Sequence, residues 1–219
     1  MKFLKIYLIC ILIAAIIPNI SFAKGKNIKN LRTADKFAFR EKFLKKFPRL
    51  YINTTREDAV FLRIMIESRS AKRGVEVGSA NGYGAMHMGM GFEYTGGMLY
   101  TIEIDSNMAQ QCRKNIEKLG LEKSVKCITG DALKVIPKLK GTFDFVFIDA
   151  VKSDYYRYFK AIEPKLKRGA IIVADNVIKY AAPMQDFLNA MEKSQDYDMV
   201  IIRASEEKHD GMAVIVKKM

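Results

Sequence analysis

Three polar side chains stand directly after two short apolar segments of the chain. Asp149 follows residues 143–148, and Asp175 and Asn176 follow residues 170–174. Both segments are rich in β-branched or aromatic residues, so we expect two buried parallel strands with polar groups at their carboxyl ends. Ligands of open α/β sheets bind at that edge. Two carboxylates and one amide oxygen brought together there would supply the hard oxygen ligands that suit Mg²⁺.

Lys152 follows Asp149 by three residues and is the candidate proton acceptor of this set. The positive charge of a nearby dication would disfavour the ammonium form of the lysine, which makes its amine a candidate general base at neutral pH. Each residue also has an ordinary structural alternative. Asp175 and Asn176 could form a strand-terminating turn, and Lys152 could be a solvated surface residue.

A glycine-rich segment upstream favours the functional interpretation, because it converges on the same edge of the sheet. Residues 74–84, GVEVGSANGYG, indicate a short strand, a tight turn and the start of a helix, whose free N–H groups carry partial positive charge. The order Glu-x-Gly-x-x-x-Gly differs from the dinucleotide fingerprint and from a P-loop, which disfavours hydride transfer and nucleotide hydrolysis. About 20 residues downstream, Glu103 could accept both ribose hydroxyls of an adenosine-type cofactor. The alternative for Glu103 is a strand-end charge turned to solvent.

These motifs resemble those of the class I S-adenosylmethionine-dependent methyltransferases, and within them the metal-dependent O-methyltransferases of the catechol and caffeoyl-CoA type. The resemblance covers roughly residues 55–217. The glycine loop, the strand end at Glu103 and the turn 130–132 match the larger superfamily. The block Asp149-x-x-Lys152-x-x-Tyr155 and the strand that ends in Asp175 and Asn176 match this subfamily.

The resemblance implies a role for each matching residue. Asp149, Asp175 and Asn176 would hold a divalent metal such as Mg²⁺, and Lys152 would be the catalytic base. S-adenosylmethionine would be bound by Glu76, Gly78 and Tyr83 at its methionine end, by Glu103 at the ribose, and by Asp131 and Ala132 at the adenine. Gly82 and Asp149 would also belong to the cofactor site. Gly84 stands where the family often has Ser or Thr to bond the cofactor carboxylate, so this contact must come from elsewhere, such as backbone N–H groups.

The implied reaction moves a methyl group from S-adenosylmethionine to a hydroxyl of a small acceptor. A phenol or enol hydroxyl has a pKa of about 10 and is a poor nucleophile at neutral pH. Coordination to a dication stabilises its anion, and Lys152 can take the proton. Chelation through two adjacent oxygens favours a catechol-like or vicinal-diol acceptor. A same-fold methyltransferase acting on protein or RNA, or a non-catalytic exported binding protein, would not need Asp149, Lys152, Asp175 and Asn176 together.

The order of elements predicts the fold that would position these residues. The chain has 219 residues, of which 49% are hydrophobic, enough for one domain with a sizeable core. After the glycine loop, strand-like and helical segments alternate, which favours a doubly wound, Rossmann-like, mostly parallel α/β sheet. The resemblance implies seven strands with N-terminal helices in front of them. Residues 199–203 and 212–216 predict an antiparallel final pair of strands, because no long helix separates them.

The first 54 residues are predicted to be separate from a methyltransferase domain over residues 55–219. Lys2 and Lys5, an apolar run over residues 6–17 and the sequence Ser-Phe-Ala before Lys24 are typical of a secretory signal peptide, residues 1–23, that is cleaved. We therefore expect an exported, periplasmic or secreted protein, or a membrane-attached one. The alternative is a membrane anchor with the catalytic domain facing the cytosol, favoured by the positive charge after the run and by the cytosolic origin of the cofactor.

The chain is basic, with a formal net charge of +13. Its lysines are scattered, which argues against a specific nucleic-acid site. The densest basic stretch, residues 24–49, has phenylalanines at helical intervals and lies in a predicted basic N-terminal helical segment, residues 24–54. We expect a helix packed on the domain, with a membrane-surface helix or a lid as alternatives. With only two histidines, a His-based metal site or a Ser-His-Asp triad is disfavoured. The sequence leaves open whether the chain forms a homodimer.

Overall fold

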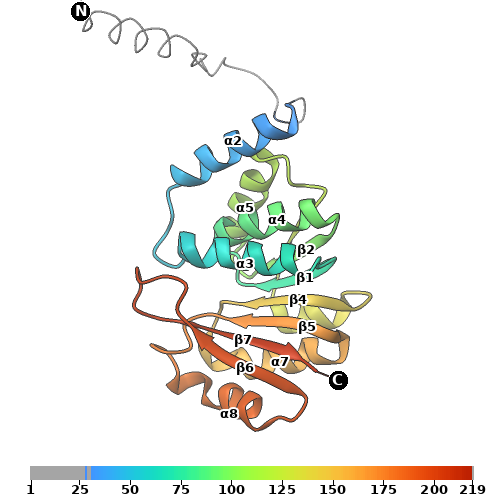
Figure 1. Ribbon diagram of the computed structural model, residues 1–219, viewed down its shortest axis with the longest axis vertical. Coiled ribbons are helices and arrows are strands. Elements are labelled where there is room, and N and C mark those ends of the chain that lie inside the picture. Colours follow the sequence, from blue (N-terminus) through green and yellow to red (C-terminus); the bar gives the residue numbers. More distant parts are fainter. Residues whose placement is uncertain (1–27, 29–30, 219) are drawn as a thin grey trace, which may run out of the picture.

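Seven strands form one mostly parallel sheet in the computed structural model of the chain, which describes residue 28 and residues 31–218 (Figure 1). The strands are β1 (Arg73–Val77), β2 (Met98–Glu103), β3 (Val125–Thr129), β4 (Phe143–Ile148), β5 (Leu166–Ala174), β6 (Tyr197–Ile202) and β7 (Met212–Lys217). Their order in the sheet is β3-β2-β1-β4-β5-β7-β6, and only β7 runs against its neighbours. The predicted doubly wound fold and its antiparallel final pair are therefore confirmed.

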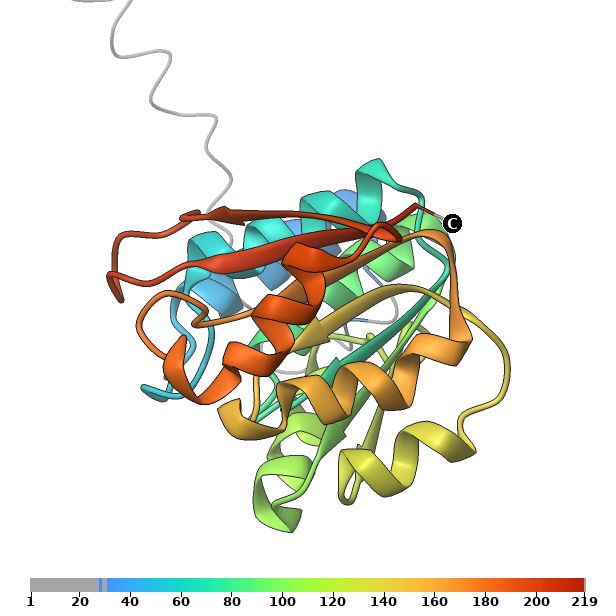
Figure 2. The ribbon, with the colours of Figure 1, turned by 90° about the horizontal axis from the view of Figure 1, so that it is seen from below.

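Helices cover both faces of the sheet (Figure 2). One face carries α3 (Arg56–Ser68), α4 (Tyr83–Thr95) and α5 (Ser106–Lys118), with α2 (Thr33–Lys45) outside them; the other carries α6 (Ala132–Val135), α7 (Tyr155–Ile162) and α8 (Gln185–Lys193). Strand β4 shows how the sequence separates the two layers. Phe145 and Phe147 pack in the cluster of α3 and α4, whereas Val146 and Ile148 pack in the cluster of α7, because alternate side chains of a strand point to opposite faces.

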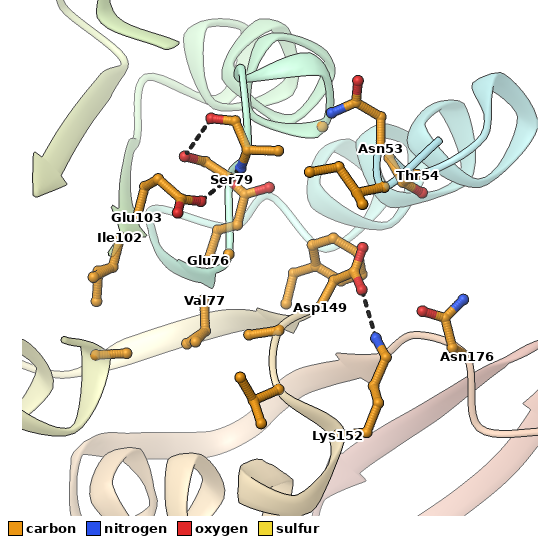
Figure 3. A pocket seen from close by; sticks show the side chains of 18 of the residues that line it. Asn53, Thr54, Glu76, Val77, Ser79, Ile102, Glu103, Asp149, Lys152 and Asn176 are labelled. Carbon is orange, nitrogen blue, oxygen red and sulfur yellow. Dashed lines mark hydrogen bonds and ion pairs between the residues drawn. The ribbon is translucent and has the colours of Figure 1, made fainter. Parts of the chain in front are cut away.

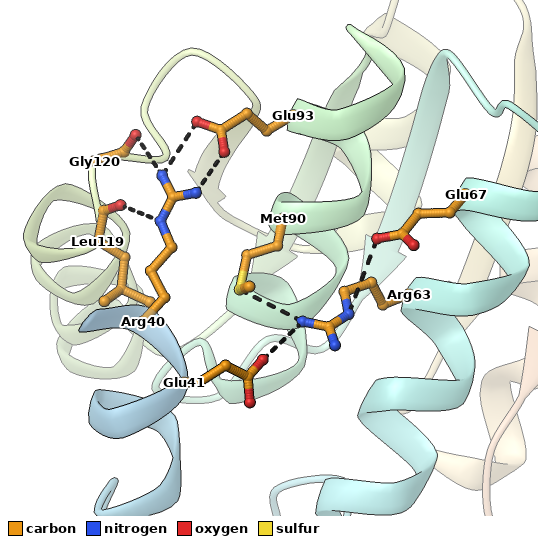
Figure 4. Close-up of polar contacts among 8 residues, drawn as sticks. All are labelled: Arg40, Glu41, Arg63, Glu67, Met90, Glu93, Leu119 and Gly120. Atoms are coloured by element: carbon orange, nitrogen blue, oxygen red, sulfur yellow. Dashed lines mark hydrogen bonds and ion pairs between the residues drawn. The ribbon is translucent and has the colours of Figure 1, made fainter. Parts of the chain in front are cut away.

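The helix α2 is attached to the domain by the buried Arg40 (Figure 4). The guanidinium of Arg40 donates to the carbonyl oxygen of Leu119 at 2.9 Å and to that of Gly120 at 3.4 Å, and it pairs with both carboxylate oxygens of Glu93. The two carbonyls belong to the chain that follows α5, and Glu93 lies in the last part of α4. The side chain of Arg40 thus satisfies two backbone acceptors that follow α5 and a carboxylate on α4.

None of the helices within residues 31–218 is long and apolar enough to cross a membrane. The predicted signal peptide, residues 1–23, lies outside the described residues, so its cleavage stays a prediction.

Candidate active site

A cavity of about 440 Å³ opens at the carboxyl ends of the parallel strands (Figure 3). It is lined by the loops that follow β1, β2, β3, β4 and β5 and by the segment that precedes α3. The strands β1 and β4 are neighbours in the sheet but not in the sequence, which makes their carboxyl ends the point where the strand order reverses. This is the position at which open α/β sheets bind ligands.

The glycine loop lies against the end of β4. Gly78 has a φ of +90°, and a Cβ atom there would stand 2.1 Å from the carbonyl oxygen of Asp149, so only glycine fits. Gly82 has a φ of +93° and lies behind the loop, where a Cβ atom would stand 2.8 Å from Sγ of Cys112. The close contact of two loops places the residues after β1 and those after β4 in one cavity.

Glu103, Asp131 and Ala132, the residues expected at the ribose and the adenine, all line the cavity. One carboxylate oxygen of Glu103 accepts from the N–H of Ala80 at 2.8 Å, and the other accepts from the N–H of Asp105 at 2.9 Å. Each oxygen keeps a further acceptor position. Glu103 is therefore held rigidly and can still accept hydroxyl groups of a ligand.

Glu76 and Thr54 present buried polar atoms that have no hydrogen-bond partner among the residues that the structure describes. Oε2 of Glu76 and Oγ1 of Thr54 are both unpaired, and both residues line the cavity. Burial raises the pKa of Glu76 to about 8. Since an unpaired buried polar atom costs stability, this end of the cavity is suited to a ligand with both donors and acceptors.

Thr54 was not among the predicted site residues, although it lies close to Gly84 in space. A Cβ atom on Gly84 would lie 3.4 Å from Cγ2 of Thr54, so Thr54 lies beside the position where the resemblance led us to expect a Ser or Thr. The local signal is the sequence Asn-Thr directly before Thr55-x-x-Asp58, in which Thr55 accepts from the N–H of Asp58 and caps α3.

Tyr83 is the predicted site residue whose side chain lies elsewhere. Its ring is buried, stacks on Phe47 with centroids 5.5 Å apart and meets His87 at 5.0 Å, and it does not line the cavity. His87 is buried as well, and burial lowers its pKa to about 3, so it is neutral. The ring of Tyr83 therefore does not reach the cavity, and the role of this residue at the methionine end stays a prediction. Gly82 contributes the backbone turn and does not line the cavity either.

Lys152 and Asp149 form an ion pair that faces the cavity (Figure 3). Nζ of Lys152 donates to Oδ1 of Asp149 at 2.7 Å and to the hydroxyl of Tyr155 at 2.8 Å. That hydroxyl donates in turn to the carbonyl oxygen of Asp175 at 3.0 Å. The three residues of the Asp-x-x-Lys-x-x-Tyr block are therefore linked to each other and to the end of β5.

Asp175 lies buried beside this pair, and Asn176 lines the cavity. The pKa of Asp175 is raised to about 8, first by burial and then by the negative charges of Asp149 and Asp58. Asn176 has a φ of 62°, which Asn tolerates, and its N–H donates to Oδ1 of Asp175 at 2.8 Å. Within the described residues no three His, Cys, Asp or Glu side chains gather as a metal site. The polar groups at this end of β4 and β5 are instead the carboxylates of Asp149 and Asp175, the amide of Asn176 and the amine of Lys152.

Asp210 fixes the loop that follows Asn176 and was not predicted either. Its Oδ1 accepts from the N–H groups of Ile178 at 3.0 Å, Lys179 at 2.9 Å and Gly211 at 2.8 Å. Because β7 is antiparallel to β5, the residues before β7 lie at the carboxyl end of β5. In the sequence, Asp210 and Gly211 form an Asp-Gly pair directly before the final strand. This pair indicates a turn, and only the antiparallel pairing of β7 with β5 brings it to the site.

A family model for O-methyltransferases matches residues 33–208, which is more than half of the chain. The chain belongs to this O-methyltransferase family. It is 35% identical over 184 residues to a catechol O-methyltransferase of Niastella koreensis, covering 76% of this chain and 83% of the relative. It is 30% identical over 189 residues to caffeoyl-CoA O-methyltransferase 1 of Nicotiana tabacum, covering 77% and 79% of the two chains. The family match includes α2, so the similarity extends further toward the N-terminus than residue 55.

Solved structures have the same fold as this O-methyltransferase. The cofactor-bound structure of Rv0187 from MTB superposes with a TM-score of 0.74 at 26% identity, covering 84% of this chain and 90% of that one. The O-methyltransferase of Bacillus cereus in complex with SAH superposes with a TM-score of 0.74 at 21% identity, covering 86% and 93%. The protein is an S-adenosylmethionine-dependent O-methyltransferase of the catechol and caffeoyl-CoA type, which confirms the resemblance found in the sequence.

Proposed function

We propose that this O-methyltransferase uses a divalent metal to methylate one hydroxyl of a small acceptor that has two adjacent hydroxyls, such as a catechol. The observation that carries the proposal is the joint placement of Asp149, Lys152 and Asn176 on one side of the cavity, with Asp175 buried beside them. A protein or RNA methyltransferase would not need this set. The named relatives that act on catechols support the same acceptor class.

The residues fit a divalent metal of the Mg²⁺ type. Asp149, Asp175 and Asn176 would hold it through two carboxylate oxygens and one amide oxygen, with water or substrate in the remaining positions. The two carboxylates disfavour each other's charge in a buried place. Lys152 and the N–H of Asn176 offset this repulsion in part, so a second positive charge is favourable there. When bound, the metal would stabilise the anion of an acceptor hydroxyl.

Lys152 would take the proton of that hydroxyl. Its amine is oriented by Asp149 on one side and by the hydroxyl of Tyr155 on the other, so the atom that accepts the proton is held at the cavity wall. The resulting oxyanion attacks the methyl carbon of the sulfonium, and both charges are neutralised as the bond forms. The protein gains most by holding the two groups in line in a place that excludes water.

The cofactor would lie along the rest of the cavity. The carboxylate of Glu76 would accept the ammonium of S-adenosylmethionine, and the hydroxyl of Thr54 would donate to its carboxylate in place of the Ser or Thr missing at Gly84. Glu103 would accept the ribose hydroxyls. Asp131, Ala132 and the exposed Ile104 would surround the adenine.

Cofactor affinity is expected to increase with pH because of Glu76. Its pKa of about 8 leaves the carboxyl protonated in the empty protein, while the cofactor ammonium binds the ionised form, so binding releases a proton. Between about pH 6 and about pH 7.5 the affinity should rise by up to about tenfold per pH unit, below the range in which the ligand's own amino group titrates. Isothermal titration with S-adenosylmethionine measures this directly.

The matched variant is Glu76→Gln, which keeps the shape and removes the titrating group. It should bind roughly 10-fold or more weakly near pH 7.5 and lose the slope, since it lacks a charge-assisted hydrogen bond. An unchanged slope in this variant would assign the pH dependence to another group and remove Glu76 from the ammonium site.

Methyl transfer to catechol, compared with its isomer hydroquinone, tests the proposed acceptor class. Both have two phenolic hydroxyls, but only the adjacent pair of catechol can chelate one ion. Mass spectrometry should detect a singly methylated product of catechol, with hydroquinone turned over at least about 10²-fold more slowly, the usual worth of a well-oriented reaction geometry. Equal turnover of the two isomers would rule out chelation of a vicinal diol.

A further inference from the structure

A second hollow, of about 220 Å³, adjoins the catalytic cavity. Tyr51, Asn53, Lys179 and Lys208 line both, so the two spaces share a wall. An acceptor whose hydroxyls lie at Asp149 and Lys152 can therefore extend toward this hollow. The remaining lining residues are Arg49, Leu50, Glu207 and His209.

The charges in this hollow do not cancel. The guanidinium of Arg49 donates to both carboxylate oxygens of Glu207, at 2.9 Å and 2.7 Å, so these two residues neutralise each other. Nζ of Lys179 and Nζ of Lys208 donate instead to backbone carbonyls, those of Lys208 at 3.4 Å and Asn53 at 2.5 Å. Among the described residues, these two ammonium groups at the border of the two spaces therefore make no ion pair with a carboxylate.

The nearby acids do not form ion pairs with these lysines within the described part of the chain. Lys208 attracts the buried Asp58 electrostatically without being in an ion pair with it. Oδ1 of Asp210 accepts from three backbone N–H groups, and its Oδ2 is buried and makes no hydrogen bond or ion pair with either lysine. An anion that enters from solvent would therefore meet two donors whose charge is not matched by a direct partner.

The border also exposes apolar surface. The side chain of Tyr51 is 78% exposed, with its ring centroid 5.6 Å from Nζ of Lys208, and Ile52 is 61% exposed. An aromatic body that lies between the catalytic cavity and the hollow would cover these two side chains. A ligand with hydroxyls at one end, a ring in the middle and a negative charge at the other end could use the catalytic residues, the apolar surface of Tyr51 and Ile52, and the two ammonium groups.

We propose that the natural acceptor is an aromatic vicinal diol that carries a carboxylate, and that Lys179 and Lys208 bind this carboxylate at the border of the second hollow. The proposal rests on the proposed function and names the acceptor class of the same site. Lysine recognises such a group as a point charge, so the preference depends on charge rather than on one fixed geometry.

The test compares dihydroxyphenylpropanoic acid with its primary amide, which differ in charge and hardly in size. With Mg²⁺ present, the wild-type enzyme should show a KM for the acid that is about tenfold lower than for the amide, with similar kcat, and added salt should reduce this ratio. In the double variant Lys179→Met/Lys208→Met the ratio should fall to about one. A thermal melt of each variant establishes that it is folded.

Two controls separate charge from structure. The double variant Lys179→Arg/Lys208→Arg keeps both charges and should keep the preference for the acid, as should Lys114→Met, which removes one charge from an exposed position of α5. Equal KM values for acid and amide in the wild type, or a preference that survives the double Met variant, would overturn the proposal. Methylation of neither compound nor of catechol itself would instead refute the proposed function, and this proposal with it.

Discussion

Replacing Asp175 by Ala should abolish methyl transfer while leaving cofactor binding nearly intact. Asp175 lies at the end of β5, away from the glycine loop, and its Oδ1 holds the N–H of Asn176. The substitution removes one proposed metal ligand and releases the neighbouring one, so kcat should fall by at least about 10²-fold. Initial rates with catechol and titration with the demethylated cofactor measure the two effects separately. The exposed Asp196→Ala is the matched control.

Loss of the Asp175 charge should not unfold the protein, and the variant Asp175→Asn, which keeps the shape of the side chain, separates a functional loss from a structural one. Burial raises the folded-state pKa of Asp175 from 3.8 to about 8. The stability that this carboxyl contributes is full below its unfolded pKa and is lost as the pH rises toward 8, so at neutral pH the metal-free fold gains nothing from it. Asp175→Asn should therefore melt at the same temperature as the wild type or higher. Near-normal turnover of Asp175→Ala in the presence of chelator would refute the metal assignment.

Replacing Lys152 by Ala should lower kcat by roughly 10²-fold or more, the usual worth of a positioned proton acceptor. Cofactor affinity should change little. Raising the pH should restore part of the rate, because a larger share of the acceptor hydroxyl is then ionised without help. Initial rates as a function of pH provide the measurement.

Lys152→Arg separates proton transfer from charge. Arginine can keep the ion pair with Asp149 but cannot act as a base, since its guanidinium stays protonated. If Lys152 accepts the proton, the Arg variant should be about as slow as the Ala variant. A nearly normal rate with Arg would show that Lys152 acts only through its positive charge.

Much of the fold followed from local pattern. The predicted strand at residues 143–148 coincides with β4, because this segment is short, apolar and bounded by turns or helices. β5 begins at Leu166 rather than at the predicted residue 170. Its first part was missed because the exposed Lys167 and Arg168 interrupt the apolar segment. The helix α8 was not predicted. Its buried residues are Phe187, Leu188 and Met191, which pack on the core formed by α7 and β6. These long-range contacts were not visible in the local sequence.

The candidate site was predictable where a side chain directly follows a strand. Asp149, Asn176 and Glu103 line one cavity because parallel strands end at one edge of the sheet. Tyr83 shows the limit of this reasoning. It follows the glycine loop directly, but it also stands four residues before His87 on α4, and the helical period turns both side chains toward the core. Thr54 and Asp210 reach the site through contacts between distant segments, which no local pattern reveals.

The most direct test of the account is the metal dependence of methyl transfer to catechol. The wild-type protein is treated with a chelator, its binding of S-adenosylmethionine is measured, and its rate with catechol is followed before and after Mg²⁺ is added back. We expect that the chelated protein still binds the cofactor, that its rate falls by at least about 10²-fold, and that Mg²⁺ restores the rate. A full rate in the presence of chelator would contradict it, because Asp149, Asp175 and Asn176 would then have no metal to hold.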